Sequence, residues 1–96
     1  LEIPLPQKLE VIIGREDPAS NIFPDIDTTT YGGNLCGVSR RHARIVLQGN
    51  QYFIEDLNSV NSTFVNKIKL APKQRFPLND GDELILGRLK FTVRIG

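Results

Sequence analysis

The sequence predicts an all-β fold, a sandwich or a barrel, and three observations support this prediction. Short apolar runs alternate with polar residues, which is the pattern of half-buried strands. Turn dipeptides such as Gly49-Asn50 and Asp80-Gly81 separate these runs. No window of about eleven residues carries apolar positions at helical spacing. We therefore expect many short strands joined by turns, with little or no helix.

Strands are expected along most of the chain. The clearest run, from Leu89 to Ile95, alternates apolar and polar residues without a break. Gly49-Asn50 favours positive φ angles and predicts a tight hairpin between its two flanking strands. In chain order, we expect strands at 9–13, 43–47, 52–56, 63–65, 68–70, 75–76, 83–86 and 89–95. The core candidates are Leu9, Val11, Ile13, Ile45, Leu47, Phe53, Leu57, Phe64, Val65, Leu84, Leu86, Phe91, Val93 and Ile95.

The segment from Glu16 to Val38 lacks a strand pattern. It is rich in Pro, Asp, Thr, Asn and Gly. Long connections in compact domains are often binding loops. We therefore expect this segment to contribute to a binding site.

Composition and charge exclude several classes of protein. The chain has 96 residues, of which 40% are hydrophobic and 24% charged, and its formal net charge is +1. This size fits one domain, and the near-neutral charge argues against a protein that wraps a nucleic-acid backbone. The apolar runs are too short for direct insertion into a membrane. One Cys and one His provide neither an internal disulfide framework nor a zinc cluster, so we expect no metal and no cofactor.

The domain organisation follows from the same pattern. The chain starts with Leu rather than Met, and we expect it to be a domain of a longer protein. Residues 1–8 are expected to be an N-terminal linker or a cloning remnant, and residues 9–96 the domain itself. A single cysteine fits a reducing compartment, so we expect the cytoplasm, including the cytosolic part of a larger membrane-associated protein. Without a heptad pattern, we expect the isolated domain to be a monomer.

Three polar segments interrupt the strands, and all three lie at expected strand ends. They are Gly14-Arg15, Ser39-Arg40-Arg41-His42 and the stretch 58–63. Loops at one end of a β-sandwich cluster together. A site built from them would hold Arg15, Ser39, Arg40 and Asn61. Guanidinium, hydroxyl and amide groups suit the binding of a phosphate beside a peptide backbone.

The order and spacing of four motifs resemble a known family. The motifs are Gly14-Arg15, then Ser39-x-x-His42, then Asp56-Leu57-x-Ser59-x-Asn61-x-Thr63-x-x-Asn66, and finally Leu78-x-x-Gly81-Asp82-x-Leu84-x-x-Gly87. Together they resemble the forkhead-associated (FHA) domain, in its bacterial type, over nearly the whole chain. This resemblance implies a two-sheet β-sandwich with ligand-binding loops at one end. It also implies recognition of phosphothreonine in partner proteins that Ser/Thr kinases modify, as a signalling and protein-protein interaction module.

The resemblance assigns roles to individual residues. Arg15 is similar to the arginine that grips the phosphate, which carries a charge of about −1.5 to −2. Ser39 is similar to the serine whose hydroxyl and amide bind phosphate oxygens, and Arg40 occupies the position of a frequent second phosphate contact. Asn61 is similar to the asparagine that holds the ligand's backbone. The family's supporting positions, which orient the arginine, brace the loops and shape a turn, are matched by Gly14, His42 and Asn66.

Three positions depart from the family's pattern. Val60 stands where the family often has a polar residue, and Ser62 and Lys67 stand where it often has glycine. If the position of Ser62 requires a positive φ, serine costs about 1 kcal/mol there. Additional ligand contacts are expected from Arg41, Ser59, Val60 and Ser62.

Other functions fit the sequence less well. Ser39, His42 and Asp56 are the residue types of a hydrolase triad, but Ser and His three residues apart at a strand start do not suit it, so we expect no enzyme and no catalytic residue. Nucleic-acid binding would depend on Arg15, Arg40, Arg41 and Arg44, and the weak net charge argues against it. The alternative that remains is an FHA-fold module that binds a protein partner independently of phosphorylation.

Overall fold

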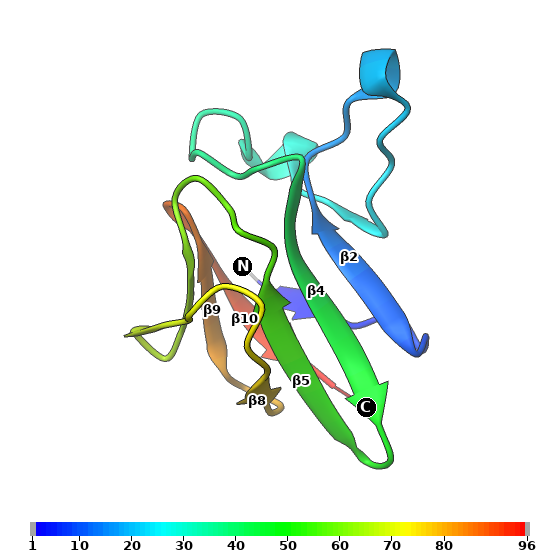
Figure 1. Cartoon of the computed structure of the whole chain (residues 1–96), viewed down its shortest axis with the longest axis vertical. Coiled ribbons are helices and arrows are strands. Elements are labelled where there is room, and N and C mark those ends of the chain that lie inside the picture. Colours follow the sequence, from blue (N-terminus) through cyan, green and yellow to red (C-terminus); the bar gives the residue numbers. More distant parts are fainter. Residues whose placement is uncertain (1, 96) are drawn as a thin grey trace.

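The fold is a two-layer β-sandwich, as the resemblance implies (Figure 1). The computed structural model describes residues 2–95, which form two sheets of five strands each. The strands are β1 (Glu2–Pro4), β2 (Glu10–Gly14), β3 (Ile26–Asp27), β4 (Arg41–Gln48), β5 (Gln51–Asp56), β6 (Thr63–Val65), β7 (Ile68–Lys69), β8 (Phe76–Leu78), β9 (Glu83–Leu86) and β10 (Leu89–Arg94). The helical elements of residues 2–95 are two short 3-10 turns, η1 (Pro18–Ser20) and η2 (Thr29–Tyr31).

The strand order shows how local hairpins build the two sheets. One sheet has the order β1-β10-β9-β6-β7, and the other has the order β3-β2-β4-β5-β8. The hairpin predicted at Gly49-Asn50 is confirmed, because β4 and β5 pair antiparallel up to Gln48 opposite Gln51. Gly49 has a φ of +62°, a conformation that glycine adopts without steric cost.

The core lies between the sheets, and in β6, β9 and β10 it is filled by every second residue. Ile13, Ile54, Leu86 and Phe91 are among its fully buried side chains. The core prediction is wrong for Leu9, which is 75% exposed because β2 begins only at Glu10. The remaining core candidates are buried or partly buried, the partly buried ones being Leu47, Phe53, Leu57, Phe64 and Ile95.

Two edge strands lie where no strand was expected. Glu2–Pro4, in the segment assigned above to a linker, pairs in parallel with β10, and Ile3 is only 5% exposed. Ile26–Asp27, in the expected binding loop, pairs in parallel with β2. Residues 2–4 are therefore an ordered part of the sandwich, and the long connection is anchored to a sheet at its middle.

The three polar segments lie at one end of the sandwich, at the top of Figure 1. The β4–β5 hairpin lies at the opposite end. This arrangement places the connections after β2, before β4 and after β5 next to one another. Within residues 2–95, no helix has the length and apolar character needed to cross a membrane.

Candidate functional site

Direct hydrogen bonds join the three loops at this end of the sandwich. The backbone amide of Arg15 donates to the carbonyl of Arg40 at 3.1 Å. The amide of Val60 donates to the hydroxyl of Ser39 at 3.2 Å. The side-chain amide of Asn61 donates to the carbonyl of Gly37 at 2.9 Å. The structure therefore brings together Arg15, Ser39 and Asn61, which are far apart in the sequence.

Arg15 owes its position to the glycine before it. A Cβ on Gly14 would lie 2.0 Å from the carbonyl oxygen of Arg40, so only glycine lets the two backbones approach this closely. The Nε of the half-buried Arg15 donates to the carbonyl of Val38 at 3.2 Å. That bond fixes one side of the guanidinium. Among residues 2–95, no hydrogen-bond partner occupies its terminal nitrogens.

His42 braces two of the loops from inside the fold. Its fully buried ring accepts a hydrogen bond from the amide of Ser39 at Nδ1, over 3.0 Å. Because Nδ1 is an acceptor, the ring proton is on Nε2, which donates to the carbonyl of Ser62 at 2.8 Å. Burial lowers the pKa of His42, which favours this neutral form.

Asp56 organises the loop after β5. Its Oδ2 accepts the backbone amide of Ser59 at 3.0 Å, and its Oδ1 accepts the hydroxyls of Ser59 and Thr63. Ser59 is therefore turned toward Asp56. The side chain of Val60 is 86% exposed, and Ser62 has a φ of +70°, the strained conformation anticipated from the sequence.

These contacts are incompatible with a hydrolase triad. Both ring nitrogens of His42 are engaged by backbone atoms, and the hydroxyl of Ser39 accepts an amide instead of donating to the imidazole. The carboxylate of Asp56 is bonded to Ser59 and Thr63. Within residues 2–95, no three potential metal-ligating side chains gather in one place.

The side chains of Arg40 and Arg41 lie in different environments. Arg40 Nη1 lies 2.9 Å from Asp17 Oδ2 and donates to the hydroxyl of Ser20 at 3.3 Å. This contact with Arg40 lowers the pKa of Asp17. Arg41 is exposed and lines a pocket with Phe23 and its neighbours. Arg40 is therefore attached to the connection after β2, and Arg41 faces a different surface.

Asn66 lies in the β6–β7 turn and ties that turn to β9. Its side chain donates to Asp82 at 3.0 Å and accepts the amide of Glu83 at 2.9 Å. Asn66 and Lys67 have φ angles of +48° and +70°. The turn therefore keeps positive φ angles without the glycine that the family often has.

The β9–β10 turn supports the site and was missed as a functional element. A Cβ on Gly87 would lie 2.5 Å from the carbonyl oxygen of Cys36. The amide of Arg88 donates to that same carbonyl at 2.8 Å, and its guanidinium contacts the carbonyl of Leu35. The turn thus holds the segment that ends at Gly37, the partner of Asn61. The signal available in the sequence was the glycine itself, Gly87, the last residue of the fourth motif.

Comparisons with known proteins agree on the family. The family model described as the FHA domain matches residues 11–87. The chain is 41% identical over 88 residues to protein FraH of Nostoc sp., covering 91% of this chain and 29% of FraH. It is 40% identical over 84 residues to the FHA domain-containing protein FhaA of Mycobacterium tuberculosis, covering 88% of this chain and 14% of FhaA. The chain thus spans less than a third of either relative.

Solved structures give the same result. The FHA domain of FhaA, in complex with the intracellular domain of Rv3910, has a TM-score of 0.68 and 32% identity, over 90% of this chain and 80% of that one. The N-terminal FHA domain of Saccharomyces cerevisiae Rad53p, in complex with a phosphothreonine peptide, has a TM-score of 0.64 and 28% identity, over 81% and 56%. The four motifs, the two-sheet sandwich and these matches show that the chain belongs to the FHA domain family.

Proposed function

We propose that this domain binds phosphothreonine-containing segments of partner proteins that Ser/Thr kinases modify. The observation that carries the proposal is the joining of Arg15, Ser39 and Asn61 at one end of the sandwich by loop-to-loop hydrogen bonds. The related domain of Rad53p, which was solved with a phosphothreonine peptide, supports it. In a longer protein, the domain would act as a cytoplasmic signalling module.

The free hydrogen-bonding groups of the site match a phosphate. Arg15 offers its terminal guanidinium nitrogens for charge-assisted bonds to a group of charge about −1.5 to −2. The hydroxyl of Ser39 already accepts the amide of Val60, which leaves its own proton available for a phosphate oxygen. We therefore assign the phosphate to Arg15 and Ser39, with Arg40 reaching it if it leaves Asp17.

Asn61 suits the peptide backbone beside the phosphothreonine. One of its two amide hydrogens is used by the carbonyl of Gly37. The second hydrogen and the carbonyl oxygen remain for a backbone carbonyl and a backbone amide of the ligand. Because the loops are tied together before binding, little additional ordering of the domain is required. The function is binding without catalysis.

A calorimetric titration tests the proposal. A phosphothreonine peptide library and its dephosphorylated counterpart are titrated against the wild type, Arg15→Ala and Lys69→Ala. The last variant removes an exposed cation of β7 as a matched control. We expect Arg15→Ala to weaken phosphopeptide binding at least about 30-fold, the effect of removing one partner of a charged contact, and Lys69→Ala to bind as the wild type does.

A second candidate function, binding of a protein partner without phosphate, is favoured by one observation. Leu35 and Val60 expose 81% and 86% of their surface on the loops of the site. Apolar side chains on exposed loops are available for contacts with a partner protein. Equal affinity for the phosphorylated and dephosphorylated libraries, unchanged in Arg15→Ala, would reject the first function in favour of this one.

A further inference from the structure

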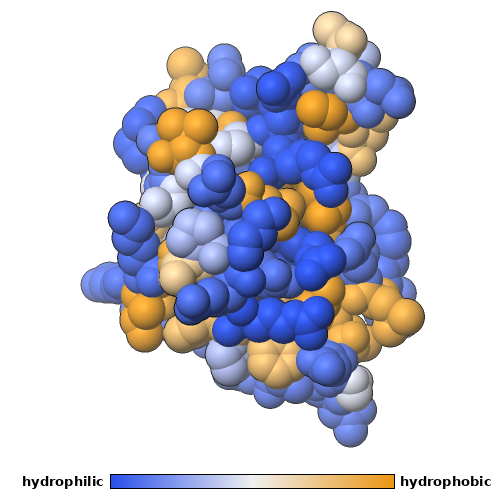
Figure 2. Space-filling model, in the orientation of Figure 1, coloured by the Kyte–Doolittle hydropathy of each residue, from blue (hydrophilic) through white to orange (hydrophobic). Residues whose placement is uncertain are grey.

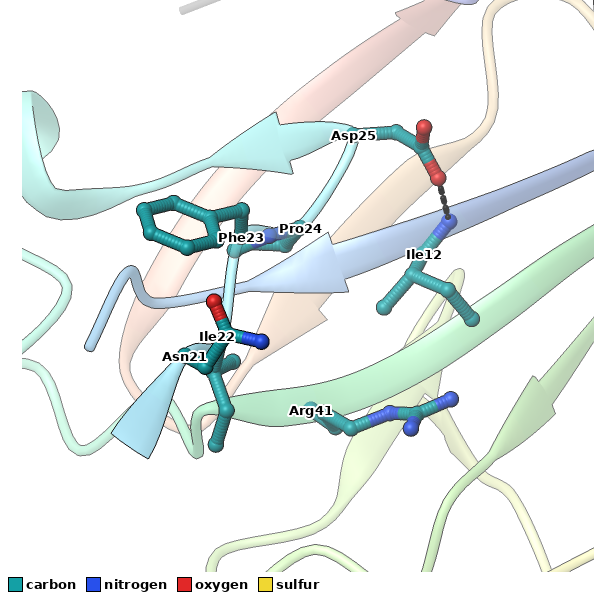
Figure 3. Close-up of a pocket in the computed structure, with 7 residues that line it drawn as sticks. All are labelled: Ile12, Asn21, Ile22, Phe23, Pro24, Asp25 and Arg41. Carbon is teal, nitrogen blue, oxygen red and sulfur yellow. Dashed lines mark hydrogen bonds between the residues drawn. The ribbon is translucent and has the colours of Figure 1, made fainter. Parts of the chain in front are cut away.

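A pocket lies beside β2 and β4, and none of Arg15, Ser39 and Asn61 lines it. It has a volume of about 270 Å³ and a mixed lining, in which Ile22 and Phe23 are apolar and Asp25 and Arg41 are charged. Figure 3 shows Ile22 and Phe23 on the segment after η1, and Ile12 of β2 and Arg41 of β4 also line the pocket. We call it the side pocket.

The wall of the side pocket is held in place by hydrogen bonds. Asp17 and Ile22 exchange two backbone hydrogen bonds of 3.0 Å, which close the loop that carries the wall. Asp25 Oδ2 accepts the amide of Ile12 at 2.8 Å and ties the far end of the wall to β2 (Figure 3). Arg40 adds a third tie through Asp17. The pocket is therefore formed before any ligand arrives.

The charge of the side pocket is unbalanced. The carboxylate of Asp25 is compensated, because it pairs with Lys8 and accepts the amide of Ile12. These contacts lower the pKa of Asp25 and keep it ionised. The guanidinium of Arg41, in contrast, has no ion pair or hydrogen bond to any residue in the range 2–95. The charge that remains for a ligand to neutralise is positive.

The size and the lining point to part of a protein rather than a small molecule. Pockets for small molecules are usually about 300–1,000 Å³, and this one is slightly smaller, which suits one or two side chains. Phe23 is 61% exposed at its rim, and Figure 2 shows scattered hydrophobic residues among the mainly hydrophilic ones on the visible face. Aromatic and arginine side chains are enriched where proteins bind one another.

We propose that the side pocket binds an unphosphorylated peptide segment of a partner protein in which a bulky apolar side chain lies next to a carboxylate. The apolar side chain packs among Ile12, Ile22 and Phe23, and the carboxylate pairs with Arg41. This contact is independent of the phosphate site. A partner that carried both a phosphothreonine and such a segment would be held at two places, and its apparent affinity would rise because the second binding event is then intramolecular.

A charge-exchange titration followed by NMR tests this proposal. The probes are the acetylated, amidated tetrapeptides Gly-Glu-Leu-Gly and Gly-Lys-Leu-Gly, added to the full chain. With the wild type, we expect the amide signals of Ile22, Phe23 and Arg41 to shift, and the Glu peptide to bind about two- to fivefold more tightly, the range of an exposed ion pair. With Arg41→Glu, the preference is expected to reverse. Lys69→Glu, the matched control, is expected to keep the wild-type preference.

Three further results separate this proposal from the alternatives. Phe23→Ala is expected to weaken both tetrapeptides at least about threefold and to bind phosphopeptides as the wild type does. Arg15→Ala is expected to keep tetrapeptide binding, so the phosphate site can fail without this inference failing. No charge preference, or shifts confined to residues 57–62, would overturn the proposal. Concentration-dependent shifts of Phe23 without peptide would assign the pocket to a second copy of the chain and also overturn it.

Discussion

The buried imidazole of His42 gives a direct test of how the loops of the site are held. We consider the substitution His42→Ala. It removes the acceptor of the Ser39 amide and the donor to the Ser62 carbonyl, at 3.0 Å and 2.8 Å. Each polar group left without a partner costs about 1–3 kcal/mol. Removing the fully buried ring also leaves a cavity, which lowers the free energy of unfolding further.

The expected loss is therefore about 2–5 kcal/mol in the free energy of unfolding, a large part of the total for a small domain. Urea denaturation at pH 7.5 measures it, with Lys69→Ala as a control that stays within about 0.5 kcal/mol of the wild type. A loss below about 1 kcal/mol would refute the assignment of His42 as a brace.

The same substitution makes a prediction for pH. Burial lowers the pKa of His42 below its ordinary value of 6.5, so the unfolded chain binds the proton more readily than the folded one. The stability of the wild type is fully present above pH 6.5 and falls as the pH drops below it. The slope is at most about 1.4 kcal/mol per pH unit. Urea denaturation between pH 7.5 and 5.5 should show this slope for the wild type and a smaller one for His42→Ala. If the wild type and His42→Ala showed equal slopes, the burial of this imidazole would not be the cause of the pH dependence.

Three other substitutions test the supports of the site. Gly87→Ala places a Cβ 2.5 Å from the carbonyl oxygen of Cys36 at a φ of +62°, and we expect it to lower the free energy of unfolding by about 1–3 kcal/mol in urea denaturation. Asp56→Asn weakens the acceptor that binds the hydroxyl of Thr63 at 2.7 Å, and we expect it to lower the free energy of unfolding by about 1–3 kcal/mol in urea denaturation. An unchanged free energy of unfolding would contradict the role of Asp56 in organising the loop. Ser62→Gly relieves a φ of +70° and should raise the free energy of unfolding by about 1 kcal/mol, which a lower melting temperature would disprove.

The strands that bury one face were predictable from the sequence. The expected strands at 63–65 and 83–86 have the same bounds as β6 and β9, and the run from Leu89 ends one residue later than β10. In these strands every second side chain enters the core, so apolar and polar residues alternate along the sequence and reveal the strand. Leu9 continues that period on the sequence but lies outside the sheet, because periodicity does not say where a strand ends.

The two parallel edge strands could not be predicted in the same way. β1 has three residues and β3 has two, which is too short for an alternating pattern. Their positions depend on pairing with β10 and β2, and β1 is separated from its partner by almost the whole chain. Such pairing is decided by how the sandwich closes and not by the residues of the short strand alone.

For the site, the loops could be predicted and the side-chain partners could not. The motifs indicate that Arg15, Ser39 and Asn61 lie at one end of a sandwich, and the hydrogen bonds between their loops agree with this. The pairing of Arg40 with Asp17 depends on the conformation of the long connection after β2. No local pattern encodes that conformation.

The parallel pairing of β1 with β10 has a mechanical consequence. Glu2, Ile3 and Pro4 lie opposite Thr92, Val93 and Arg94, and the amide of Leu5 donates to the carbonyl of Arg94 at 3.0 Å. Opposite forces applied to the two ends of the chain would pull these strands along their own length. The bonds between them would then be loaded in shear and would share the force, whereas an antiparallel pair would open like a zipper. A domain pulled at its two ends would therefore resist extension at this edge.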